Sequence, residues 1–153
     1  MGEGNGMKRN IQYLWTPAVT MVLAGMFLWA CSGESIDTGP RGQQAVQIVK
    51  AYTPEGGIYS IISNIEKMAA DSQRAGDKWE LGPWEAGMPT RRDVLMDRLS
   101  EYFTFLRPTG DYWVRFTYKD KAGTHVALWQ TNVYTRKVEA QNDEARKFAL
   151  PQS

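Results

Sequence analysis

The sequence predicts an α+β domain in which amphipathic helices pack on a three- to four-stranded antiparallel sheet. Residues 58–75 repeat apolar side chains every three or four positions, which is the pattern of an amphipathic helix. Residues 111–140 instead alternate apolar and polar side chains around turn sequences, as hairpin-connected strands do. Helices therefore precede most strands along the chain, an order typical of the α+β class. A length of 153 residues suits one such domain.

Three segments have the spacing of helices. The first is residues 43–52, and the sequence Thr-Pro-Glu-Gly-Gly that follows it ends the helical pattern. Its apolar residues lie largely on one side: Ala45, Val46, Ile48, Val49 and Tyr52. The second, residues 58–75, ends at Gly76 and contains Ile58, Ile61, Ile62, Ile65, Met68 and Ala69. The third, residues 91–105, contains Val94, Leu95, Leu99, Tyr102 and Phe103. Residues 102–105 of this third segment fit a strand equally well.

The remaining segments are typical of strands. Pro83 limits residues 78–85 to an edge position or an extended turn. Residues 111–118 place Trp113, Arg115 and Thr117 on the face opposite Tyr112, Val114, Phe116 and Tyr118. A turn at 120–123 leads to a return strand at 125–133, and a shorter strand follows at 138–140. Asn142 or Asp143 can then cap a closing helix that runs to residue 150. We expect the apolar face of the sheet to pack on the 58–75 helix, a layout similar by analogy to the cystatin-like or NTF2-like group.

The beginning of the chain has the layout of a secretory signal peptide. Lys8 and Arg9 precede a run without charge from Asn10 to Gly33, and its densest apolar part is residues 18–30. A basic end followed by a short apolar segment and a small-residue junction is the pattern of a cleaved leader. The basic end stays on the cytoplasmic side while the apolar part enters the bilayer.

The junction Leu28-Trp29-Ala30-Cys31 resembles the lipobox of bacterial lipoproteins, an aliphatic residue and two smaller residues before a cysteine that receives diacylglycerol. Leu28, Ala30 and Cys31 match the motif, whereas Trp29 stands where a small side chain is usual. The resemblance implies a membrane lipoprotein, acylated with palmitate or a similar chain at Cys31 and facing the periplasm. Ser32 follows the cysteine in place of the aspartate that commonly retains such proteins at the inner membrane, which favours the outer membrane.

These observations divide the chain into three parts. Residues 1–30 are predicted to be the signal peptide, residues 31–44 the lipidated cysteine with a flexible tether rich in Gly, Ser, Asp and Pro, and residues 45–153 the domain. An alternative remains open, because the uncharged run approaches the ~20 residues that a spanning helix requires. The chain would then be a single-span accessory subunit of an integral membrane complex, with Cys31 a small buried apolar residue.

The charged and reactive residues give little indication of catalysis. From Cys31 onward the chain carries 16 basic and 16 acidic residues, so its overall charge gives no reason to expect a nucleic-acid partner or an anionic membrane. One cysteine excludes an intrachain disulfide, and the single histidine, His125, begins a strand after a turn, where an exposed imidazole is usually incidental. Glu80 and Glu85, beside tryptophans, would be the acid–base pair of a small hydrolase, but solvated carboxylates are the simpler interpretation. We predict no enzyme, cofactor or metal site.

Aromatic side chains are the more informative group. If Trp113 and Arg115 share a face with Trp129 across the hairpin, they form an aromatic-basic patch, and these residue types are enriched at binding hot spots. Trp79 and Trp84 could extend it. The competing interpretation is that Trp113 and Trp129 pack on the 91–103 helix or on one another, and that Trp79 and Trp84 pack inward. The sequence therefore predicts a lipid-anchored envelope protein whose domain binds another envelope component without catalysis.

Overall fold

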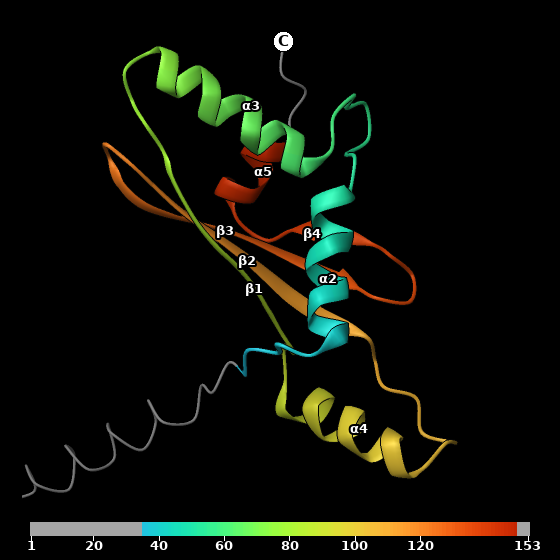
Figure 1. The fold of residues 1–153 in the computed structure, drawn as a ribbon. Helices are drawn as coiled ribbons and strands as arrows, with labels where there is room; N and C mark the ends of the chain where they lie inside the picture. Colours follow the sequence, from blue (N-terminus) through green and yellow to red (C-terminus); the bar gives the residue numbers. More distant parts are fainter. Residues whose placement is uncertain (1–34, 150–153) are drawn as a thin grey trace, which may run out of the picture. The chain divides into compact units, whose positions relative to one another are not determined.

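The computed structural model describes residues 35–149 as helices α2 to α5 and a four-stranded antiparallel sheet (Figure 1). This confirms the α+β class. The helices are α2 (Pro40–Ala51), α3 (Ile61–Arg74), α4 (Arg91–Tyr102) and α5 (Asp143–Ala149). The strands are β1 (Glu80–Gly87), β2 (Asp111–Asp120), β3 (Gly123–Asn132) and β4 (Val138–Ala140), and they lie in the sheet in that order. The signal peptide, Cys31 and the predicted end of the last helix at residue 150 lie outside the described residues.

Helix α2 begins earlier than the sequence predicted. Gly39 is its N-cap and Pro40 occupies the first turn, where a missing N–H costs nothing. The preceding residues already belong to the domain, because the amide of Asp37 donates to the carbonyl of Ala86 at 2.7 Å and Ile36 bridges to Gly87. The predicted tether of residues 31–44 is therefore wrong from residue 36 onward, and the domain starts well before residue 45.

Residues 35–39, here called the lead-in segment, lie against the first turn of α2. A Cβ added at Gly42 would sit 2.1 Å from the carbonyl oxygen of Asp37, so only glycine permits this approach. From the sequence, Gly42 is expected to belong to the flexible tether, because its neighbours are polar and small. Its physical role is to let two pieces of backbone touch.

The apolar face of the sheet is covered by α2 and α5, and α3 packs on these two helices (Figure 1). The expectation that the 58–75 helix covers the sheet directly is therefore wrong. That helix also starts later than predicted, at Ile61, because Ser60 caps it, and Ile58 before it is largely exposed. The largest fully buried side chains include Trp129, Tyr112, Phe116, Phe148, Ile61 and Ile65.

The strand predictions hold closely. β1 lies at the sheet edge and its register is irregular between Leu81 and Trp84, around Pro83. The two-residue turn after Asp120 joins β2 to β3 with unbroken pairing down to Asp111 and Asn132. Residues 102–105 form no strand: α4 ends at Tyr102 and a loop follows.

Candidate functional site

The sheet has one face without a helix, which we call the outer face. Within the described residues, α2, α3 and α5 all lie on the side of Phe116 and Trp129, and α4 makes few contacts with the other elements. Side chains from all four strands line the outer face: Glu85, Trp113, Arg115, Thr117, Val126, Leu128, Gln130 and Glu139. This face is the candidate binding surface.

Arg115 is the centre of the outer face. Its Nε donates to Oε2 of Glu85 on β1 at 2.9 Å, and a second guanidinium nitrogen lies 2.8 Å from the same oxygen. The guanidinium also lies 5.4 Å from the ring centroid of Trp113, within the range of a cation–π contact. The predicted pairing of Trp113 with Arg115 on one face is therefore correct. The Glu85 carboxylate fixes the guanidinium in a defined position over the strands.

Trp129 does not belong to this surface. The register pairs Val114 with Trp129, and residues directly opposite in an antiparallel pair share a face. Trp129 is consequently on the helix-covered side, where it is 1% exposed. The expectation that Trp113, Arg115 and Trp129 share one face is wrong, since a hairpin turn one residue longer or shorter would be needed to produce it.

Trp79 and Trp84 also lie on the helix-covered side. Trp79 stacks on Tyr118 with ring centroids 4.5 Å apart, and Trp84 stacks on Phe116 at 4.7 Å. Both are half-buried and pack against the core. These two tryptophans therefore belong to the core, as one interpretation of the sequence had it, and do not share a patch with Trp113.

Trp113 itself is less exposed than a surface anchor would be, at 9% of its full area. Its ring lies against Gly87, where an added Cβ would come within 2.4 Å of the indole. The alternation of β2 indicates only which face a side chain occupies, so the sequence left open whether Trp113 is exposed or packed. Arg115, about a third exposed, is thus the more accessible member of the pair.

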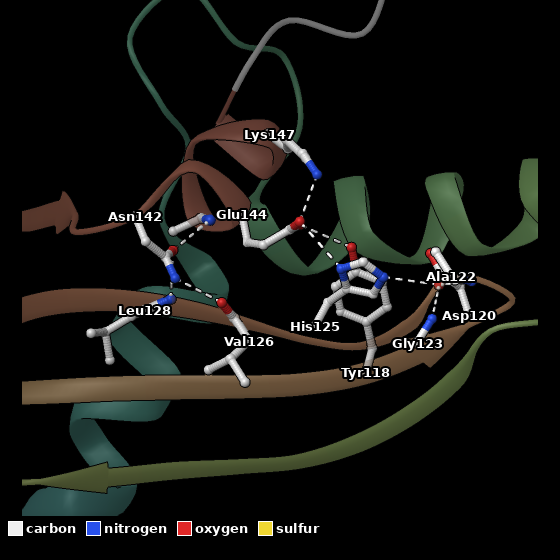
Figure 2. A network of polar contacts seen from close by, with 11 residues as sticks. Tyr118, Asp120, Ala122, Gly123, His125, Val126, Leu128, Asn142, Glu144 and Lys147 are labelled. Atoms are coloured by element: carbon white, nitrogen blue, oxygen red, sulfur yellow. Dashed lines mark hydrogen bonds and ion pairs between the residues drawn. The ribbon is translucent and has the colours of Figure 1, made fainter.

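His125 belongs to a polar cluster beside the turn between β2 and β3 (Figure 2). Its Nε2 lies 2.9 Å from Oδ1 of Asp120, its Nδ1 lies 3.4 Å from Oε1 of Glu144, and its ring stacks on Tyr118 at 4.9 Å. The predicted incidental, exposed imidazole is therefore wrong: the ring is half-buried and both nitrogens face carboxylates. The signal was available, because the short turn pairs His125 with Tyr118 on the core face.

Hydrogen bonds and burial shift the pKa values of three groups in this cluster. The hydrogen bond from His125, with the amides of Ala122 and Gly123, holds the pKa of Asp120 below its ordinary value. Burial raises the pKa of Glu144, but hydrogen bonds from Lys147 and Tyr118 and the charges of Lys147 and His125 outweigh it and lower the pKa. Burial, together with the Glu144 carboxylate, raises the pKa of the Tyr118 phenol. The arrangement joins the β2–β3 hairpin to α5.

Glu80 and Glu85 are poorly placed for paired acid–base chemistry. Glu80 pairs with Lys119 and Glu85 with Arg115, so the two positions are four residues apart along β2. At about 3.4 Å per residue this is roughly 14 Å between backbones. Glycosidase carboxyl groups lie about 5–9.5 Å apart. The Glu85 carboxylate is in addition bound to Arg115.

A cavity of about 450 Å³ lies between the lead-in segment and α4. It is lined by Ser35, Ile36, Asp37, Met88, Val94, Asp97, Arg98, Glu101 and Tyr102. Asp97 pairs with Arg41 of α2, and Asp93 accepts hydrogen bonds from Thr90 at 2.6 Å and Thr109 at 2.9 Å. The Arg41–Asp97 pair holds α4 beside the start of the domain, and the Thr109–Asp93 bond ties it to the segment before β2.

Within residues 35–149, no group of His, Cys, Asp or Glu is arranged to hold a metal ion, and no helix has the length and apolarity to cross a bilayer. No family model matches the chain, and no curated protein or solved structure matches it either. The function has to be argued from the residues themselves.

Proposed function

We propose that this chain is a lipid-anchored protein of the bacterial envelope, and that its domain binds another envelope component through the outer face of the sheet. The anchor is the acylated sulfur of Cys31, as the lipobox-like junction implies. No catalysis is involved in this role. The observation that carries the binding part is the Glu85–Arg115–Trp113 arrangement on the face that no described helix covers.

Several features of that face support binding. Arginine and tryptophan are the residues most often found at binding hot spots, and here the arginine is already fixed by a carboxylate, so little conformational entropy is lost on contact. Val126, 39% exposed, and the half-buried Leu128 add apolar surface beside it. A half-buried cation with apolar neighbours suits a protein partner that offers a carboxylate or a backbone carbonyl.

The anchor is tested by metabolic labelling. Radiolabelled palmitate should enter the wild-type protein in a bacterial host and should not enter a Cys31→Ser variant. The mass of the mature N-terminus separates this from the single-span alternative: an acylated Cys31 supports the proposal, whereas a chain that begins at Met1 or Met7 supports an uncleaved membrane anchor.

The binding surface is tested by site-specific photo-crosslinking in cells. A photoreactive amino acid at Val126, on the outer face, should capture one envelope protein reproducibly. The matched control is the same amino acid at the exposed residue Gln73 on α3, which should capture none. Addition of Arg115→Gln to the Val126 variant should weaken the crosslink. Equal capture at both positions, or capture at Gln73 only, would count against the outer face.

A further inference from the structure

Helix α4 and the loop after it expose an unusual amount of apolar surface. Leu95 is 56% exposed, Tyr102 80%, Phe103 47% and Phe105 79%. We call these four residues the α4 apolar surface. Phe103 and Phe105 touch each other, with ring centroids 5.8 Å apart, and so form one aromatic unit. Clustered exposed aromatics of this kind mark a surface that meets another apolar phase.

The position of this surface relative to Cys31 is limited by the covalent chain. Ser35 is four positions after Cys31, and a fully extended chain of that length spans at most about 14 Å. Ser35 and Ile36 line the same cavity as Val94 and Tyr102 of α4. A lipid held on Cys31 therefore keeps the α4 end of the domain within a short distance of the bilayer.

The charges around α4 suit phospholipid headgroups. Arg92, Arg98 and Arg107 are exposed in this region. Of the nearby carboxylates, Asp93 is buried against two threonines and Asp97 pairs with Arg41. The exposed carboxylate of α4 is Glu101, and the three exposed arginines outnumber it. Aromatic side chains flanked by arginines are typical of the membrane–water interface.

We propose that the α4 apolar surface inserts into the lipid–water interface beside the acylated cysteine and fixes the orientation of the domain on the membrane. This inference rests on the lipid anchor proposed above. The acyl chains supply the anchoring, and the second contact prevents the domain from rotating about a single point. The occupant of this surface is a phospholipid headgroup layer that includes anionic lipid.

Acylation blocks Cys31, the single native cysteine, against thiol reagents, so an introduced cysteine can be labelled specifically. Phe105→Cys in the full-length protein is labelled with a polarity-sensitive fluorophore and reconstituted into vesicles of phosphatidylcholine and phosphatidylglycerol. We expect the emission to shift to the blue in the presence of vesicles. We also expect its intensity to fall when the vesicles contain nitroxide-labelled lipid, because the nitroxide quenches a nearby fluorophore. The control Gln73→Cys, on α3 at the other end of the domain (Figure 1), should show neither change.

Three other results would be informative. Emission from position 105 as in water, with Cys31 acylated, overturns the inference and leaves the anchor intact. Shielding of position 105 without vesicles, increasing with protein concentration, also overturns it and assigns the surface to a second copy. If the intact mass shows that Cys31 carries no lipid, the emission of the fluorophore at position 105 is measured in a protein that also carries Cys31→Ser. A blue shift there supports the α4 contact although the anchor has failed.

Discussion

The helix-covered side of the sheet and the α4 region carry similar residues but treat them in opposite ways. Phe148 of α5 is fully buried and contacts Trp79, Phe116, Tyr118 and Trp129. Phe105, after α4, is 79% exposed and touches only one other ring among the described residues, that of Phe103. In sequence both are phenylalanines near the end of a helical segment. Apolar spacing therefore indicates which face of a helix is apolar, and not what that face contacts.

Removal of one ring from each region should change stability very differently. Phe148→Ala leaves a cavity among four aromatic side chains and should lower the free energy of unfolding by about 3–5 kcal/mol. Phe105→Ala removes an exposed ring and should change it by less than about 0.5 kcal/mol. Denaturant unfolding of the purified proteins measures both. Comparable losses in the two variants would mean that α4 is part of the core.

A second substitution tests the lead-in segment that joins the two regions. Alanine normally stabilises a helix relative to glycine by about 0.5–1 kcal/mol. At Gly42, however, the added Cβ would meet the carbonyl oxygen of Asp37, so Gly42→Ala should destabilise the domain by about 1–3 kcal/mol. The sign of the change in denaturant midpoint decides: a more stable Gly42→Ala protein would show that residues 35–39 do not lie on α2.

A third substitution separates the two residues that the sequence offered as caps of the last helix. Oδ1 of Asn142 accepts from the amides of Ala145 and Leu128 at 3.0 and 3.1 Å, and its Nδ2 donates to the carbonyl of Val126 (Figure 2). Asn142→Ala should therefore cost about 1–2 kcal/mol. Asp143 makes an exposed ion pair with Arg146, and Asp143→Ala should be near neutral by the same thermal or denaturant measurement.

The sequence predicted the strands better than it predicted their surroundings. Alternation and turn length fix β2 and β3, because a period of two and a two-residue turn leave one register for the hairpin. Applied to the sequence, this register would have predicted that Trp129 lies on the core face and that His125 lies next to Tyr118. The close approach of the Trp113 ring to Gly87 was beyond reach, since the two residues are far apart in the sequence. The exposure of α4 was equally hidden, because helical periodicity does not specify a partner.

The smallest effect concerns the polar cluster at His125, which fastens the hairpin to α5. Asp120 and Glu144 both have folded-state pKa values below their ordinary values. In the unfolded chain these groups take up protons at a higher pH than in the folded protein. The unfolded state therefore binds more protons as the solution is acidified, and stability falls with decreasing pH. The stabilisation is complete above the unfolded pKa values and is lost as the pH falls through the folded ones.

Glu144→Gln tests this sign. The variant keeps the shape of the side chain but cannot ionise, so its stability at neutral pH should be lower than that of the wild type. Its loss of stability from about pH 6 to about pH 3, the range in which carboxyl groups titrate, should be shallower. Chemical unfolding at several pH values gives both slopes. Glu66→Gln, an exposed carboxylate on α3, serves as the control and should follow the wild type. If Glu144→Gln retains the full acid dependence, the contacts that Glu144 makes with His125 and Lys147 contribute nothing to holding α5 on the sheet, and Phe148 and the Asn142 cap hold that helix.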